Sequence, residues 1–252
     1  MSDFKQRMET RNADPEILDF VRPDYTFHPD FVNQFSCPDT TINGVRHYNI
    51  GEGAKYPSIT TVLSGSKSER AKKSLDNWKK RVGPVEAERV STGAKERGNK
   101  LHKIVEWFIT NDAQISTVTN KKDILLFSKI HPLLTRINNI RGIESVLYLD
   151  ALNLAGRTDL VADFDGEGAI IDIKGSTKIK EEYFIRDYFI QETFYALAYS
   201  KMYNTKIKKI VTIMATEQSD TPQLFVKDAA DYVGDLIARV KTYNERKANG
   251  TL

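Results

Sequence analysis

The chain has 252 residues and a single cysteine, Cys37. One thiol excludes an intrachain disulfide, an all-cysteine zinc site and a four-cysteine iron–sulfur cluster, and it favours a reducing, intracellular setting. No apolar run approaches the roughly 20 residues of a membrane span. The formal net charge is only +3, but residues 67–103 hold twelve Lys and Arg against five Asp and Glu. This basic stretch predicts either a polyanion-binding surface or a solvated helix face.

The first half of the chain is predicted to be an irregular arm followed by helices. Residues 1–35 contain three prolines and are expected to form only one short helix. Residues 37–57 predict a small β-hairpin region around an Asn43-Gly44 turn. Apolar periodicity then predicts three helices, over residues 68–81, 85–111 and 121–140.

The second half of the chain predicts a sheet with flanking helices. Alternating and apolar patterns indicate strands at residues 144–149, 154–176, 208–215 and 223–227, and helices at 183–203 and from Asp228 or Asp231 onwards. The fold class is therefore α+β, an α/β/α sandwich-like arrangement with a mixed sheet and an α-helical N-terminal region. We expect an arm and hairpin region at 1–56 and one domain at 57–252, divided into a helical part (57–142) and a catalytic sheet with its helices (143–252).

The central hairpin, residues 154–176, carries the strongest chemical signal. If the Asp165-Gly166 turn sets the register, Asp159 lies opposite Asp172, with Lys174 on the same face. Two carboxylates at about 5 Å repel by roughly 3 kcal/mol at an effective dielectric of about 20. Such a pair either shares a proton or binds a divalent cation, and the neighbouring lysine favours the cation. Two Asp and one Lys around a phosphate predict a nuclease-like site.

Two helices flank this hairpin with further polar groups. His102 follows Gly98 by one helical turn, and Glu106 lies one turn later on the same face. On the helix after the hairpin, Gln191 and Tyr195 have i, i+4 spacing.

These pieces, in this order, resemble the RecB-like branch of the PD-(D/E)XK nuclease superfamily. That branch is marked by Gly-x-x-x-His, a lone Asp, Asp-x-Lys and Gln-x-x-x-Tyr. The segments 57–63, 78–83 and 154–159 further resemble the mitochondrial genome maintenance exonucleases and their phage relatives. Thr158 stands where the superfamily name has proline, at a position that carries no ligand. The resemblance covers about residues 56–203 and implies a restriction-endonuclease-like core.

The resemblance also implies roles for individual residues. His102, Asp159, Asp172 and the backbone carbonyl of Ile173 would bind Mg²⁺ or Mn²⁺, which suits their oxygen and imidazole donors. Asp159, Asp172 and Lys174 would be catalytic, with Lys174 orienting the attacking water or stabilising charge on the phosphate.

Other candidates keep an alternative interpretation. Gln191 and Tyr195 would hold the scissile strand or support Lys174, although Tyr195 also fits simple core packing. The remaining candidates are Arg157 (a phosphate contact or a partner of the carboxylates), Glu106 and Glu144 (outer-shell or second-metal roles, or ion pairs with Lys103 or Arg141), and Ser58 and Thr60 (phosphate or single-strand contacts, or a helix N-cap).

The expected function is a Mg²⁺- or Mn²⁺-dependent DNA exonuclease acting on single strands, ends or flaps in replication, repair or recombination. The alternatives are an endonuclease of the same superfamily and a catalytically inactive DNA-binding module. We expect a monomer that binds DNA, with possible replication or recombination proteins as partners and no membrane association. No transit peptide is evident, since Asp3 and Glu9 are acidic. A bacterial or phage-infected cytoplasm is therefore the expected compartment.

Overall fold

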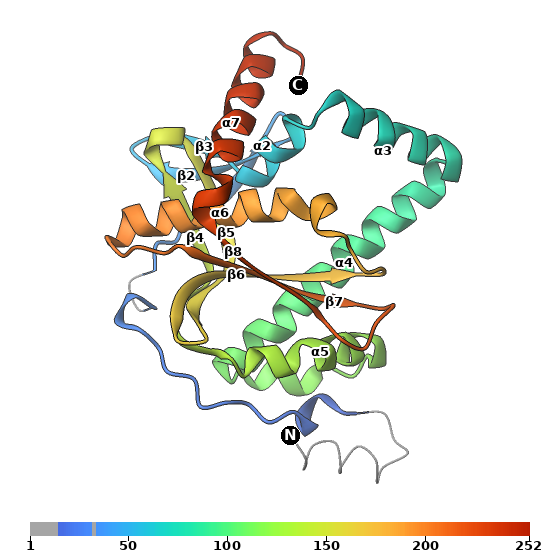
Figure 1. Cartoon of the computed structure of the whole chain (residues 1–252), viewed down its shortest axis with the longest axis vertical. Helices are drawn as coiled ribbons and strands as arrows, with labels where there is room; N and C mark the ends of the chain where they lie inside the picture. Colours follow the sequence, from blue (N-terminus) through green and yellow to red (C-terminus); the bar gives the residue numbers. More distant parts are fainter. Residues whose placement is uncertain (1–14, 32–33) are drawn as a thin grey trace.

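A mixed five-stranded sheet forms the centre of the computed structural model, which describes residues 15–31 and 34–252 (Figure 1). Its strands lie side by side in chain order: β4 (Ile137–Leu149), β5 (Leu154–Phe164), β6 (Glu167–Ser176), β7 (Lys209–Thr216) and β8 (Gln223–Asp228). Only β6 and β7 are parallel, and their connection runs through helix α6 (Arg186–Tyr203), as a parallel crossover requires. The predicted α+β fold with a mixed sheet is confirmed.

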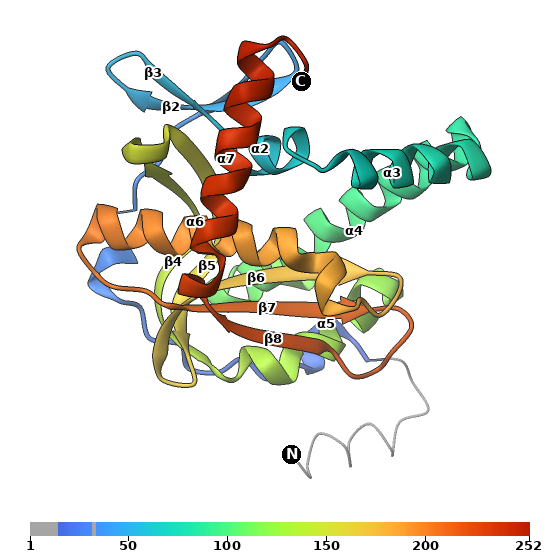
Figure 2. The same cartoon turned by 45° about the horizontal axis from the view of Figure 1, so that its top comes forward.

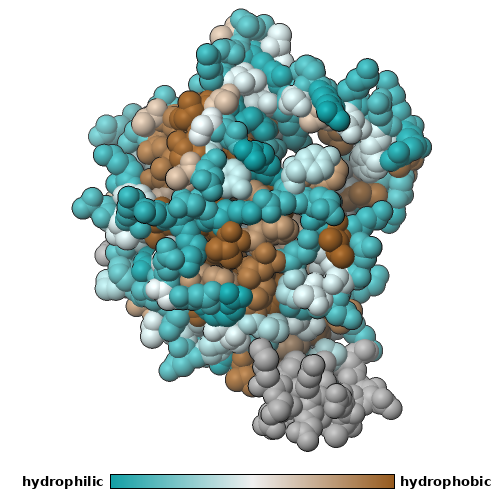
Figure 3. All heavy atoms as spheres, in the orientation of Figure 1, coloured by the Kyte–Doolittle hydropathy of each residue, from teal (hydrophilic) through white to brown (hydrophobic). Residues whose placement is uncertain are grey.

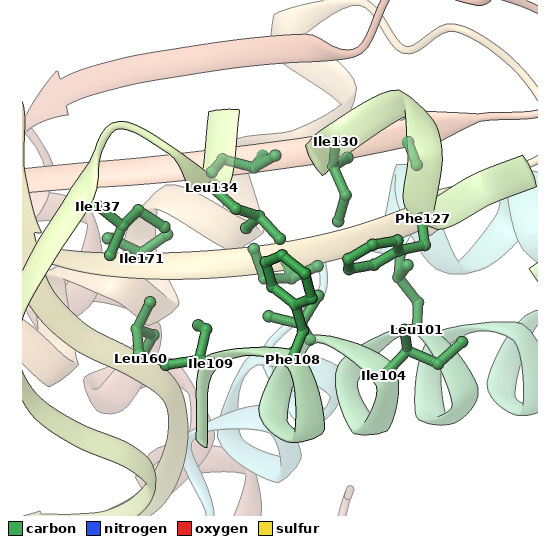
Figure 4. Close-up of a cluster of buried hydrophobic side chains, with 14 of the residues drawn as sticks. Leu101, Ile104, Phe108, Ile109, Phe127, Ile130, Leu134, Ile137, Leu160 and Ile171 are labelled. Carbon is green, nitrogen blue, oxygen red and sulfur yellow. The ribbon is translucent and has the colours of Figure 1, made fainter. Parts of the chain in front are cut away.

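Helices cover both faces of this sheet (Figure 2). One apolar cluster joins α4 (Pro84–Thr110) and α5 (Lys121–Leu134) to side chains from β5, β6 and β7. Figure 4 shows part of it, with Phe108 of α4 and Phe127 of α5 in edge contact at 5.1 Å. A second cluster joins α2 (Ile59–Gly65), α6 and α7 (Val233–Ala248) to the opposite face. Burial of alternate side chains on opposite faces fixes the register of the central strands.

A smaller sheet precedes the helices. It consists of β1 (Asp39–Ile42), β2 (Val45–Gly51) and β3 (Ala54–Pro57). Asn43 and Gly44 have φ angles of 51° and 76°, the left-handed pair that a two-residue type I′ turn needs. The predicted Asn-Gly turn is confirmed, and the region has three strands. Short 3₁₀ helices complete the fold at Ile17–Asp19, Pro29–Phe31, Ala113–Thr117, Asp150–Leu152, Glu182–Ile185 and Ala229–Tyr232.

Helix α3 (Glu69–Val82) and the first turns of α4 project from the body as an arm (Figures 1 and 2). Ser68 caps α3 by accepting a hydrogen bond from the backbone N–H of Ala71, as predicted. None of the α3 side chains is buried. The basic stretch 67–103 therefore lies largely on this solvated arm, and Figure 3 shows that this face of the molecule is mostly hydrophilic.

The predicted end of one helix is wrong. The third helix was expected to extend over residues 121–140, but α5 ends at Leu134 and Ile137 begins β4. Ile137 pairs with Phe164 of β5, so cross-strand pairing overrides an apolar spacing that fits either structure.

Two other expectations concern the N-terminus and the division of the chain into regions. The interpretation of the N-terminus as lacking a transit peptide rests on Asp3 and Glu9, which lie outside the described residues. The division at residues 56 and 57 stays a prediction. Within the described part of the chain, no helix combines the length and the apolar character that membrane crossing requires.

Candidate active site

The central hairpin opens into a fork beyond Leu160 and Ile171. From Phe164–Glu167 to Leu160–Ile171 the strands β5 and β6 pair in the predicted register. The turn residues Asp165 and Gly166 have φ angles of 53° and 78°, as a type I′ turn requires. Beyond that point the pairing of β5 continues with β4, and that of β6 with β7. The ladder therefore ends before Asp159 and Asp172, and the predicted pairing of these two residues does not form.

Side chains bind the backbone groups that the fork leaves without a strand partner. The N–H of Ile173 donates to Asp159 Oδ2 at 2.8 Å. The carbonyl oxygen of Ile173 lies 2.5 Å from His102 Nε2, which is itself 3.5 Å from Asp159 Oδ2. Unpaired backbone groups in a protein interior need such partners. The fork thus brings α4, β5 and β6 together at one point.

Glu144 of β4 completes a cluster of potential metal ligands. The cross-strand pairs on either side of Glu144 place it opposite Asp159. His102, Glu144 and Asp159 each offer one ligand atom, and these atoms lie within 4.8 Å of one another. Burial raises the pKa of Glu144, and the charge of Asp159 raises it further. The backbone of Glu144 has a φ of 49°, a left-handed conformation that costs about 1–3 kcal/mol at a non-glycine residue and often marks a functional site.

A cavity of about 10 Å³ lies among these side chains and has room for about one water molecule. His102, Glu106, Glu144, Asp159 and Ile173 are among the residues that line it. An imidazole nitrogen, carboxylate oxygens and a carbonyl oxygen around so small a space fit Mg²⁺ or Mn²⁺. The residues present therefore suit the divalent cation that the sequence predicts.

Asp172, which is buried, and Lys174, which is partly exposed, form a second group on the α6 side of the fork. The ammonium of Lys174 contacts the carboxylate of Asp172. Burial raises the pKa of Asp172 to about 6, although the charge of Lys174 opposes this shift. Burial also works against the charge of Lys174, but Asp172 and Asp159 together raise its pKa above the ordinary value. The Tyr188 ring, on α6, has its centroid 5.2 Å from Lys174 Nζ.

Sequence reasoning missed Glu192, one residue after Gln191. Its side chain is fully buried, and it accepts a hydrogen bond from the hydroxyl of Thr212. Its second carboxylate oxygen has no hydrogen-bond partner among the described residues. Burial and the nearby charge of Asp172 both raise the pKa of Glu192. A signal was present, because the apolar residues of α6 surround Glu192 and predict a helix buried on most of its circumference.

Gln191 and Tyr195 lie together, as their spacing predicts. Gln191 Nε2 donates to the Tyr195 hydroxyl at 3.1 Å. Tyr195 is buried, and a Cβ added at Gly156 of β5 would lie 2.8 Å from its ring. The core-packing interpretation of Tyr195 therefore describes its surroundings, while Gln191 remains partly exposed. A substrate can reach Gln191 more readily than Tyr195.

Arg157 and the two glutamates differ in their partners. Arg157 is exposed on β5, and its charge lowers the pKa of Glu144, so it acts on the carboxylate cluster. Glu106 forms the expected ion pair with Lys103 at 2.8 Å and also lines the small cavity. The alternative pairing of Glu144 with Arg141 is wrong, because Arg141 contacts Asp163.

Ser58 and Thr60 lie at the beginning of α2. Ser58 is buried and caps that helix, accepting a hydrogen bond from the N–H of Thr61 at 3.1 Å. Thr60 is exposed, and its hydroxyl lies 2.9 Å from that of Ser58. The N-cap alternative is therefore the one observed at Ser58.

Comparison with known families agrees with this geometry. Residues 134–246 match the PD-(D/E)XK nuclease superfamily. The match extends from the end of α5 into α7 and contains Glu144, Asp159, Asp172 and Lys174. It confirms the superfamily resemblance that the motifs indicate. His102 lies outside the matched residues and is joined to them by the fold.

Two curated relatives are similar to this chain. Mitochondrial genome maintenance exonuclease 1 of Homo sapiens is 24% identical over 214 residues, which cover 77% of this chain and 59% of the human protein. The Mus musculus protein of the same name is 25% identical over 128 residues, covering 49% of this chain and 38% of the mouse protein. The chain thus spans less than two thirds of the length of these relatives.

Proposed function

We propose that this protein is a divalent-metal-dependent DNA exonuclease that acts on single strands, free ends or flaps during DNA replication, repair or recombination. One observation carries the proposal: His102, Glu144 and Asp159 converge around a space for one small ion, beside the ion pair of Asp172 and Lys174. The match to a nuclease superfamily and the similarity to relatives named as exonucleases support it.

Four groups would hold the cation. They are the side chains of His102, Glu144 and Asp159 and the carbonyl of Ile173. When bound, Mg²⁺ or Mn²⁺ supplies Lewis-acid polarisation of the phosphate and lowers the pKa of water. Direct ligation by Asp172 stays a prediction from the sequence.

Lys174 would act on the phosphate itself. Asp172 holds the Lys174 ammonium in place, and the Lys174 side chain is 20% exposed, so it reaches the surface of the site. A fixed positive charge there stabilises the negative charge that develops on a phosphate during cleavage. Gln191 and Arg157, both accessible, would contact the strand on either side.

End-labelled DNA, linear and circular, single- and double-stranded, tests this function in the presence of Mg²⁺, Mn²⁺ or EDTA. We expect metal-dependent cleavage of linear single strands and none of the circle. Nicking of the circle would favour the endonuclease. Binding without cleavage under every metal would favour the inactive DNA-binding module. Asp159→Asn should abolish cleavage, whereas Asp123→Asn, which removes a partly buried carboxylate outside the ligand cluster, 3.6 Å from Lys100, should not.

A further inference from the structure

Two large aromatic side chains are exposed where the chain enters α6. Tyr183 is 73% exposed and Phe184 is 66% exposed. Their ring centroids lie 3.9 Å apart with an angle of 37° between the planes, so they form one contiguous surface. Large apolar groups that remain exposed together often mark a binding site.

The backbone that presents these rings is held firmly. Both the N–H and the carbonyl oxygen of Lys180 bond the Gln223 side chain, each at 2.8 Å. The N–H of Phe184 donates to the carbonyl of Glu181 at 3.0 Å. Ser176 Oγ binds the backbone of Lys178 twice, at 2.8 and 3.3 Å. The rings are thus displayed on a preorganised turn, which reduces the entropy lost on binding.

Two charged neighbours of the rings already have partners. Glu182 pairs with Lys227 at 2.7 Å, and Arg186 contacts Asp235 through Nε at 2.7 Å. The faces of the two rings remain accessible beside these ion pairs.

The rings lie where the chain enters α6, the helix that borders the candidate active site. Tyr183 and Phe184 lie in the 3₁₀ helix Glu182–Ile185, which leads directly into α6. Within α6, Tyr188 and Gln191 are three residues apart, a spacing that puts their side chains on one helix face. The ring of Tyr188 lies 5.2 Å from the ammonium of Lys174. The loop that carries both rings also begins directly after β6, the strand of Lys174. The exposed rings thus lie on the segment that links the strand of Lys174 to the helix of Tyr188 and Gln191.

We propose that Tyr183 and Phe184 form a stacking platform for unpaired bases of the DNA strand whose phosphate reaches Lys174. This inference rests on the proposed function and deepens it, because it assigns the preference for single strands to two residues. Stacking on an aromatic ring is available to any unpaired base, whereas in a duplex both faces of a base are already covered by its neighbours. The platform therefore selects unpaired nucleotides without reading their sequence.

Binding to a fluorescein-labelled thymidine strand, followed by anisotropy with Ca²⁺ in place of Mg²⁺, tests the platform. The double variant Tyr183→Ser/Phe184→Ser should weaken binding about 10- to 100-fold, since each stacked base contributes about 1–3 kcal/mol. Tyr183→Trp/Phe184→Trp should retain binding. The matched control Leu18→Ser/Val21→Ser removes equally exposed side chains, at 66% and 72%, and should change nothing.

Abasic nucleotides, scanned along the strand, separate stacking from other effects. Where an abasic position weakens wild-type binding, the serine variant should bind that abasic strand as well as the wild type does, because the same stacking contact has already been removed. If the serine substitutions reduce affinity for every abasic strand as much as for the normal strand, the platform is overturned. Unchanged DNA binding with an altered oligomeric state would also overturn it, in favour of a protein-docking surface.

The two proposals can fail separately. A wild-type protein that shows ring-dependent binding but cleaves no DNA under any metal would remove the exonuclease and keep the platform. A wild-type protein that cleaves single strands, with cleavage and binding unchanged in the serine variant, would remove the platform and keep the exonuclease. Thermal melting of each variant confirms that these surface substitutions leave the fold intact.

Discussion

Glu144 and Asp159 face each other across β4 and β5, with carboxylate oxygens within 4.8 Å. At an effective dielectric of about 20, two charges at that distance repel by roughly 3 kcal/mol. His102 brings an imidazole to the same point. The carboxylate repulsion that the sequence assigns to Asp159 and Asp172 also involves Glu144, because burial and the charge of Asp159 both raise the pKa of Asp172 and that of Glu144.

Glu144→Gln should stabilise the metal-free protein and abolish its response to metal. Removing one charge relieves the repulsion, so the free energy of unfolding should rise by about 1–2 kcal/mol. The increase in melting temperature caused by Mn²⁺ should disappear, because a ligand is lost. Thermal melting with and without Mn²⁺ measures both effects, with Asp123→Asn as the control outside the ligand cluster. A Mn²⁺-induced increase as large as that of the wild type would exclude Glu144 as a ligand.

Lys174→Met should abolish cleavage and destabilise the protein. The variant leaves the buried carboxylate of Asp172 without its cation, a defect that typically costs about 3–5 kcal/mol. Adding Asp172→Asn should restore much of the stability, because the uncompensated charge is removed, without restoring cleavage. Urea unfolding and a nuclease assay on both variants measure the two effects. Cleavage by either variant at the wild-type rate would contradict the role of Lys174.

Gly156→Ala should destabilise the protein by about 1–3 kcal/mol through overpacking. The added Cβ would lie 2.8 Å from the Tyr195 ring and 2.9 Å from Ile59. Gly93→Ala is the matched control, since nothing lies within 4 Å of its added Cβ and the residue is inside α4. That substitution should stabilise the protein by about 0.5–1 kcal/mol. Chemical unfolding of both variants should give shifts of opposite sign.

His131→Gln should make stability less sensitive to acid. The His131 ring packs among aromatic side chains, including Phe108 at 5.4 Å, and its Nε2 lies 3.0 Å from the carbonyl oxygen of Val21. Burial lowers the pKa of His131, although the hydrogen bond opposes this. The folded state therefore disfavours the protonated ring. The contribution of neutral His131 to the free energy of unfolding is fully present above about pH 6.5, and it is lost as the pH falls below that value, because the unfolded chain binds the proton more readily.

Urea unfolding at about pH 7 and pH 5 measures the contribution of His131. The wild type should lose more free energy of unfolding between these values than the variant. Equal losses would show that other groups carry the acid sensitivity.

The sequence determined the local parts of this protein. The Asp165-Gly166 turn set the register of β5 and β6 because only a left-handed residue pair closes so short a hairpin. Ser68 specified the beginning of α3 because its side chain can cap the first turn. The order of the acidic and basic motifs along the chain was sufficient to indicate a PD-(D/E)XK nuclease, and the match over residues 134–246 agrees.

The tertiary structure decided which residues meet. At the fork between β5 and β6, Asp159 lies opposite Glu144 instead of pairing with Asp172, because each strand exchanges one neighbour for another at that point. Burial raises the pKa of Asp172, and the charge of Asp159 nevertheless raises it further. Glu192 became a buried carboxylate only when α6 packed against β7, which local periodicity does not specify. Cross-strand pairing and burial depend on segments far apart in the chain, so a local sequence pattern does not predict them.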